Sequence, residues 1–225
     1  DICSFKTAKS NKTVFGVLAD TQSSGSNFAI SDGLVSKLAS INKDINFFMI
    51  AGDIVDRGGY ESQWNDFDKY MPVLNHQYLQ ATIPGNHELY HSSQAAYVDA
   101  TIYNQYYNNP KNGFEGRLNS SYYFKYNDIL FIMLDTMPRS NNQPNYYEEQ
   151  REWFGSVVEN NPSQFIIVMT HPGCYSTGVY DSDASIMNSQ WRETFEEYGV
   201  SLAISGHEHL YARTAPLYNN KKDEE

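Results

Sequence analysis

Short runs of apolar residues alternate along the chain with segments in which apolar side chains recur every three or four residues. The short runs are rich in β-branched and aromatic residues, which favours buried strands. Strands are expected at 14–19, 47–51, 78–83, 122–126, 129–134, 165–169 and 200–204, and helices at 31–41, 60–70, 147–159 and 189–198. This alternation predicts an α/β fold with largely parallel strand pairing.

Local signals refine several of these segments. The apolar residues of segment 31–41 recur at helical spacing, at Leu34, Val35, Leu38 and Ile41. Ser31 is the expected N-cap of that helix. Between the strands at 122–126 and 129–134, Asn127 and Asp128 predict a hairpin turn. The polar stretch 91–121 is expected to hold one helix followed by an irregular segment.

Candidate ligands follow the ends of the predicted strands. The residues that stand just past a strand end are Asp20, Asp53, Asn86, His171 and His207. In α/β folds the carboxyl edge of the sheet is where ligands bind. We therefore interpret these residues, together with His209, as one site.

The donor types in this set indicate a metal. Carboxylate, amide and imidazole donors without a thiolate suit Zn, Mn, Fe or Co. His207 and His209 are two residues apart, so on an extended segment they point to the same side. Glycine precedes Asp53, Asn86 and His207, and it permits the tight turns that such convergence needs.

Each residue taken alone has a simpler interpretation. Asp20 fits a helix cap or a turn, Asn86 a turn, and His171 a loop position before proline. We interpret His76 and His91 as surface histidines. The joint placement of the other ligands at successive strand ends favours the metal site.

The composition describes a globular chain with an acidic surface. Hydrophobic residues make up 40% of the 225 positions and charged residues 19%, which is enough for one core. The net charge of −11 opposes binding to nucleic acid. No apolar run is long enough to cross a bilayer, so no transmembrane segment is expected. We expect no nucleic-acid partner, and a monomer with an oligomer as the open alternative.

Cysteines and sequons bear on the compartment. Cys3 and Cys174 are too few for a disulfide framework, and the sequence leaves open whether they pair or stay as one buried and one exposed thiol. Sequons begin at Asn11 and Asn119 and carry meaning only in a eukaryotic secretory protein. The first ten residues lack an apolar segment, so any signal peptide has been removed or never existed. We expect an extracytoplasmic or secreted protein.

Five motifs resemble, in order, those of the calcineurin-like metallophosphoesterase superfamily. They are DTQ at 20–22, GDIVD at 52–56, GNHE at 85–88, a lone histidine at 171 and GHEH at 206–209. The resemblance covers nearly the whole chain. It implies a single catalytic domain over 1–225, folded as a four-layer α/β/β/α sandwich of two mixed sheets flanked by helices. The tail at about 218–225 is expected to be frayed or truncated.

A narrower resemblance is to the purple acid phosphatase branch and its bacterial relatives. It is carried by EEYGVSLAIS at 196–205, GHEHLYARTAP at 206–216 and QREW at 150–153. The chain departs from the branch at two positions. Asp56 stands where the branch usually has tyrosine, and Gln22 stands where the first motif has histidine, as in some secreted bacterial relatives.

The resemblance implies two divalent metal ions, which we expect to be Zn, Mn, Fe or Co. The implied ligand roles are Asp53 as the bridge, Asp20, His209 and the weak ligand Gln22 on the first ion, and Asn86, His171 and His207 on the second. His87 would be the general acid or stabilise the leaving group. Arg213 and Arg57 are candidates for phosphate contact, although exposed surface arginines are the simpler interpretation.

The implied reaction is hydrolysis of a small phosphorylated substrate, a phosphate ester, by a metal-bound hydroxide. Two ions lower the pKa of bound water to roughly 7 and clamp the phosphoryl oxygens. They bring about +4 against two carboxylates and one hydroxide, which leaves the pocket roughly +1. An acidic chain can therefore bind an anionic substrate once it is metallated.

Two alternatives to a phosphatase remain. The same site would serve a phosphodiesterase acting on nucleotides or phospholipid headgroups. The chain would otherwise be an inactive scaffold on the same fold, for which Gln22 is the only hint, because a scaffold should have lost several ligands. The loops at 90–121, 136–147 and 173–187 would set specificity, and they carry no interpretable motif.

Overall fold

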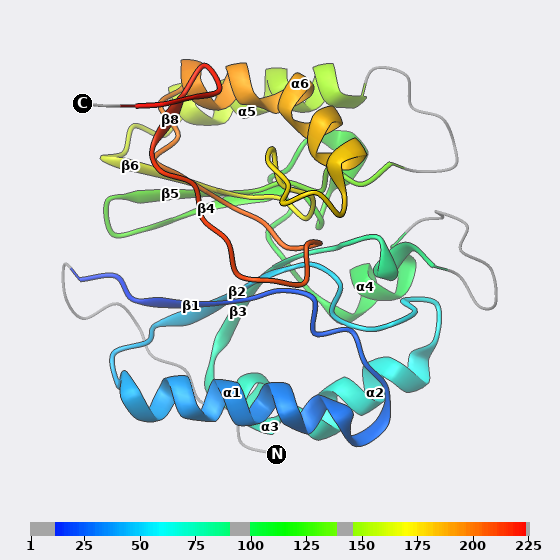
Figure 1. Ribbon diagram of the computed structural model, residues 1–225. Helices are drawn as coiled ribbons and strands as arrows, with labels where there is room; N and C mark the ends of the chain where they lie inside the picture. The colour runs from blue at the N-terminus through cyan, green and yellow to red at the C-terminus, as the bar shows by residue number, and fades with distance from the viewer. Residues whose placement is uncertain (1–11, 91–99, 139–145, 224–225) are drawn as a thin grey trace.

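The computed structural model describes residues 12–90, 100–138 and 146–223. These residues form four layers, with helices on the outside and two sheets facing each other between them (Figure 1). Helices α1, α2 and α3 cover the first sheet, and helices α5 and α6 cover the second. The predicted α/β/β/α sandwich is confirmed.

The elements follow the predicted alternation. The strands are β1 (Phe15–Leu18), β2 (Phe47–Ala51), β3 (Leu79–Ile83), β4 (Tyr122–Tyr126), β5 (Ile129–Met133), β6 (Phe165–Met169), β7 (Leu202–Ile204), β8 (Leu217–Tyr218) and β9 (Lys221–Lys222). The helices are α1 (Phe28–Ile41), α2 (Glu61–Tyr70), α3 (Pro72–Gln77), α4 (Thr101–Tyr106), α5 (Tyr146–Asn160) and α6 (Asp181–Glu197). Short 3-10 turns lie at Gly25–Asn27, His87–Leu89 and Glu115–Arg117.

Strand β2 lies at the centre of the first sheet and pairs in parallel with β1 and β3. Its alternate side chains point to opposite faces of the sheet. Phe48 and Ile50 pack into the cluster under the helices, whereas Phe47, Met49 and Ala51 pack toward the second sheet. Because both faces are covered, the whole strand is buried, which explains its continuous apolar sequence.

The second sheet has the strand order β4-β5-β6-β7. Strands β4 and β5 form the predicted hairpin, in which Asn127 has a φ of 52°. Strands β5, β6 and β7 pair in parallel. The expectation of mixed pairing therefore holds for this sheet, whereas the first sheet pairs only in parallel within the described residues. A tight turn joins β4 to β5, but helices connect β1, β2 and β3, and such crossovers produce parallel neighbours.

Aromatic rings fill the space between the sheets. Phe131 of β5 packs edge-to-face on Phe47 of β2 and on Phe15 of β1, with ring centroids 5.4 and 5.6 Å apart. It also stacks on Phe124 of β4 at 4.8 Å. Edge-to-face and stacked contacts add to the free energy gained by burial. They hold the two sheets in one relative position.

Helix α1 differs from its prediction in both start and orientation. It begins at Phe28, so Ser31 lies inside the helix and is not its cap. Phe28 and Val35, two turns apart, are fully buried. Leu34 and Ile41, which share the helical spacing, are 60% and 71% exposed. The buried face is set by the sheet and by α2 and α3, and the spacing of apolar residues alone does not select it.

Other boundaries also differ. Helix α6 begins at 181, well before the predicted 189, and α3 occupies a stretch where no helix was expected. In the tail expected to be frayed or truncated, the described residues form a small hairpin, with Leu217 opposite Lys222 and Tyr218 opposite Lys221. The helix expected within 91–121 is α4; residues 91–99, including His91, lie outside the described residues.

The structure bears on several expectations about compartment. No helix in the described ranges is long and apolar enough to span a membrane. The side chain of Asn119 is buried, and its amide donates a hydrogen bond to the carbonyl of Tyr107 at 2.9 Å, so this sequon is not presented to solvent. Within the described residues Cys174 forms no disulfide, and its side chain packs against α6. Asn11 and Cys3 lie outside the described residues.

The reactivity of Cys174 tests this description. Burial raises the pKa of its thiol to about 12, so the thiolate is scarce at pH 8. In a Cys3→Ser variant, we expect a disulfide reagent to modify Cys174 about 100-fold or more slowly in the folded protein than in urea. Fast modification of the folded variant would contradict the raised pKa of this thiol. A wild type that does not react in urea without reductant would show that the two cysteines pair.

Candidate metal centre

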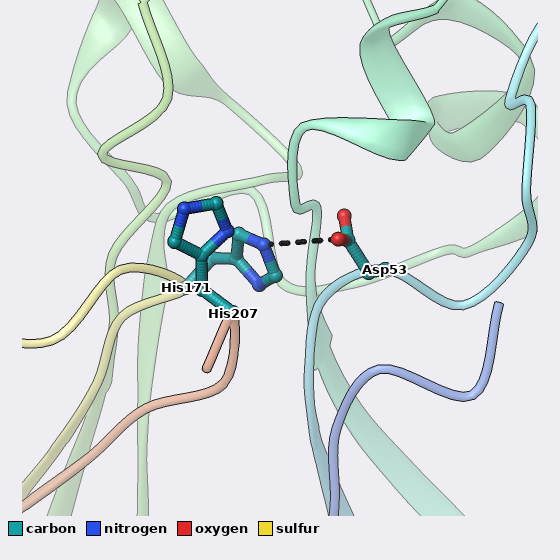
Figure 2. A group of neighbouring side chains, drawn as sticks. All are labelled: Asp53, His171 and His207. Carbon is teal, nitrogen blue, oxygen red and sulfur yellow. Dashed lines mark ion pairs between the residues drawn. The ribbon is translucent and has the colours of Figure 1, made fainter. Parts of the chain in front are cut away.

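Most of the predicted ligands meet where the two sheets face each other at the carboxyl ends of their strands. Two groups of ligand atoms lie there, each with its atoms within 4.8 Å of one another. The groups are Asp53, His171 and His207 (Figure 2), and Asp20, Asp53 and His209. Asp53 belongs to both groups. This is the spatial arrangement that two neighbouring ions with one shared carboxylate would require.

His171 connects the two sheets within the first of these groups. It is fully buried, and its Nδ1–H donates to the carbonyl of Ala51 at 2.7 Å. Its Nε2 therefore faces Oδ2 of Asp53 at 3.2 Å and Oδ1 of Asn86 at 3.1 Å. The amide nitrogen of Asn86 donates to the hydroxyl of Tyr90 at 2.9 Å. Because that nitrogen is used, the oxygen of Asn86 faces the cluster.

Asp20 holds the second group together. Its carboxylate accepts hydrogen bonds from the backbone N–H of His207 at 2.8 and 2.9 Å, and it lies 3.8 Å from Nε2 of His209. The side-chain amide of Gln22 lies 2.9 Å from the same Nε2. When the amide nitrogen of Gln22 donates to the backbone carbonyl of Asp20 at 2.8 Å, its oxygen accepts from His209. Gln22 thus lies beside this group.

Four of the candidate ligands have left-handed backbone conformations. The φ angles are 54° for Asp20, 51° for Asp53, 73° for His207 and 46° for His209. Residues other than glycine rarely adopt this region, at a cost of about 1–3 kcal/mol each. The abrupt change of direction after each strand turns these side chains toward one another.

Two glycines leave room for this convergence. Gly52 has a φ of 84°, and a Cβ there would lie 2.7 Å from Nδ1 of His171. A Cβ at Gly85 would lie 2.2 Å from Oδ1 of Asp53. Any larger residue at either position would displace a candidate ligand.

His87 lies at the border of the cluster, with its side chain 22% exposed. Its Nδ1–H donates to the backbone carbonyl of Asp56 at 2.6 Å. Its Nε2 lies 3.8 Å from Oδ2 of Asp53, and its backbone N–H donates to Oδ1 of Asp53 at 2.9 Å. The ring is therefore held in place with Nε2 directed toward the cluster.

The charges of the cluster are strongly coupled. Burial by itself lowers the pKa of His171, but the charge and hydrogen bond of Asp53, followed by the charge of Asp20, raise it to about 9. Burial opposes ionisation of Asp53, yet His171 and His87 bring its pKa below the ordinary value. An imidazole that binds a metal must be neutral. An ion bound to Nε2 of His171 would therefore displace the proton on that nitrogen, and Nδ1–H would stay hydrogen-bonded to Ala51.

The two arginines predicted to contact phosphate do not join the groups of candidate ligands. Arg57 lies 3.9 Å from the carboxylate of Asp56, and both side chains are substantially exposed. Arg213 is exposed, and among the described residues no hydrogen bond or ion pair ties it to the ligands. The carboxylate of Asp56 belongs to neither ligand group.

The order of these motifs is that of a known protein family. The model of the calcineurin-like phosphoesterase family matches residues 13–211. The chain belongs to this family.

Individual relatives confirm the resemblance to purple acid phosphatases. Purple acid phosphatase 21 of Arabidopsis thaliana is 24% identical, and the match covers 99% of this chain and 50% of the Arabidopsis protein. A nucleotide pyrophosphatase/phosphodiesterase of Hordeum vulgare is 27% identical, covering 92% and 61%. The structure of a purple acid phosphatase from yellow lupin (Lupinus luteus) seeds has a TM-score of 0.73 at 19% identity, covering 96% and 42%. The chain thus spans about half the length of these relatives.

Glu88 ends the family's GNHE motif, and no local sequence pattern indicates its role. Its carboxylate is 2% exposed and accepts hydrogen bonds from the backbone N–H groups of Asp53, Ile54, Val55 and Gly85, at 2.7 to 3.2 Å. Burial, and next the charge of Asp53, raises the pKa of Glu88 to about 7. One side chain therefore fastens the loops that carry two of the candidate ligands.

We expect Glu88→Gln to destabilise the protein and reduce its metal content. The amide nitrogen would face backbone donors, which costs about 1–3 kcal/mol for each donor left unpaired. Urea unfolding of the metal-free protein and elemental analysis of the metallated protein measure the two effects. Glu152→Gln, at an exposed position of α5, is the matched control and should change neither. Wild-type stability of Glu88→Gln would show that these hydrogen bonds do not hold the loops.

Proposed function

We propose that this protein hydrolyses phosphate esters at a centre of two divalent metal ions, either Zn, Mn, Fe or Co. The observation that carries the proposal is that Asp53 belongs to both groups of ligand atoms. The proposed ligands are Asp20, Asp53, His209 and Gln22 for the first ion, and Asp53, Asn86, His171 and His207 for the second. Membership of the calcineurin-like phosphoesterase family supports the reaction class.

The donor set fits such a pair of ions. Carboxylate, amide and imidazole groups suit the metals named above. Within each of the two clusters of carboxylates and imidazoles, the ligand atoms lie within 4.8 Å of one another. When bound, a metal pair supplies a nucleophile at neutral pH and clamps the phosphoryl oxygens. The protein's contribution is to hold these donors close together in the loops that follow the strands of its two sheets.

His87 is proposed to handle the proton of the leaving group. The carbonyl of Asp56 accepts from its Nδ1–H and fixes the ring, so a second proton would be carried by Nε2 on the side of Asp53. From there the ring can donate to the oxygen that departs from phosphorus. Its position outside both groups of ligand atoms is consistent with this role.

The acidic charge of the chain makes the metals necessary for substrate binding. The net charge is −11, and Asp20 and Asp53 lie in the cluster itself. These carboxylates attract cations and repel a phosphate. We infer that the metal-free protein binds phosphorylated substrates poorly.

A phosphomonoester is the first candidate substrate, because several similar proteins are named as purple acid phosphatases. A phosphodiester is the second, and the relative from Hordeum vulgare favours it. The chain keeps the family's ligand residue at every predicted position except one, where Gln22 replaces a histidine. This argues against an inactive scaffold.

The proposed reaction is tested with p-nitrophenyl phosphate and bis(p-nitrophenyl) phosphate on metal-loaded protein. We expect His207→Ala to abolish hydrolysis and to reduce bound metal, because it removes a donor of the second ion. His76→Ala, in helix α3 and away from both ligand groups, is the matched control and should behave as wild type. The ratio of the two rates separates monoesterase from diesterase. A wild type that binds no transition metal, or a His207→Ala variant with full turnover, would overturn the proposal.

A second prediction concerns His87→Ala. We expect kcat to fall by ~10²–10⁴ while the metal content stays unchanged, because the side chain donates a proton and holds no ion. The loss should shrink for esters with acidic leaving groups, which need less protonation. Kinetics with a series of substituted phenyl phosphates measures this dependence. Loss of metal from the variant would assign His87 to the metal ligands instead.

A further inference from the structure

The two nitrogens of the His207 ring face different neighbours. Nε2 lies 3.0 Å from Oδ2 of Asp183. The ring centroid lies 5.0 Å from that of His171, and Figure 2 shows one nitrogen of His207 on the side of His171 and Asp53. Since Nε2 is engaged with Asp183, the nitrogen on the side of the cluster is Nδ1.

Asp183 lies outside the sequence motifs, in the first turn of α6. Acidic residues are common there because they interact favourably with the helix dipole. Asp181, in the same turn and exposed, fits that general role. Asp183 makes an additional contact, since its carboxylate pairs with the His207 ring, of which only 12% is exposed.

The segment before α6 is tied to the GHEH motif at further points. Glu208 accepts hydrogen bonds from the hydroxyls of Ser176 and Thr177, both at 2.7 Å. The ring of Tyr180 packs on the ring of His207 with centroids 4.2 Å apart. These contacts hold the start of α6 beside His207, so the position of Asp183 is maintained by more than its own hydrogen bond.

We propose that Asp183 is a positioning residue for the second metal ion. Its carboxylate accepts the Nε2–H of His207, which leaves the lone pair of Nδ1 for the ion. This inference rests on the proposed function, because it assigns a role within the same site. A carboxylate on the far nitrogen of a ligand imidazole fixes its tautomer and rotation and makes it more basic, and losing one costs about 10–100-fold in metal affinity.

Calorimetric titration of the metal-free protein with Zn²⁺ alone tests the role in binding. We expect two ions in the wild type and, in Asp183→Ala, a loss of about 10–100-fold in affinity for one of them. Asp183→Asn keeps an acceptor oxygen but loses the charge, so its loss should be smaller. Asp181→Asn removes a charge from the same helix turn without touching His207 and should bind both ions as the wild type does.

Nitrogen-15 NMR of histidine-labelled, metal-free protein tests the tautomer without any activity measurement. At a pH where the imidazole is neutral, we expect the proton of His207 on Nε2 in the wild type. Asp183→Ala should lose that preference, whereas Asp181→Asn should keep it. Circular dichroism of each variant reports whether α6 and the rest of the fold remain intact.

Failure of this inference and failure of the proposed function give different results. A wild type that binds two Zn²⁺ ions, together with an Asp183→Ala variant that binds both with equal affinity, would overturn the positioning role alone. A neutral His207 with its proton on Nδ1 in the wild type would overturn it too. A wild type that binds no Zn²⁺ would overturn the proposed function and this inference together.

Discussion

The site depends on two contacts between the sheets, the hydrogen bond and the ion pair that the ring of His171 makes with the first sheet. His171 follows β6 of the second sheet, but its ring reaches the carbonyl of Ala51 and the carboxylate of Asp53, which belong to β2 and the loop after it. The pair is buried, so it is only weakly screened by solvent. It sets the separation of the two sheets at the edge where the other candidate ligands converge.

Bringing these groups together costs free energy through backbone strain and burial of charge, and hydrogen bonds from the surrounding backbone offset part of it. Asp53 has a left-handed conformation, and its carboxylate and that of Glu88 are removed from water. Glu88 offsets the cost of its own burial by accepting hydrogen bonds from N–H groups of two loops, those that follow β2 and β3. Strained residues of this kind persist where neighbours hold them, and they cluster at functional sites. The strained Asp53 and the buried Glu88 thus both mark this cluster as a candidate functional site.

Three of the candidate ligands are each oriented by a neighbouring group. The carbonyl of Ala51 orients His171, the hydroxyl of Tyr90 orients Asn86, and Asp183 contacts His207. Such partners restrict the rotation of a side chain and decide which atom faces the site. The same arrangement explains how an acidic chain forms a centre suited to cations, since the oxygens and ring nitrogens face inward together.

The sequence by itself determined the order of most elements and the residue types of the candidate ligands, because hydrophobic periodicity and residues such as Asp53 at a strand end are local signals. Tertiary structure decided which face of α1 is buried, so that Leu34 is exposed although its spacing matches that of Val35. It also decided the roles of Glu88 and Asp183, whose partners lie far away in the chain or on another element. Glu88 joins two loops of the first sheet, and Asp183 joins α6 to the loop after β7. No local pattern of residues encodes such a distance through space.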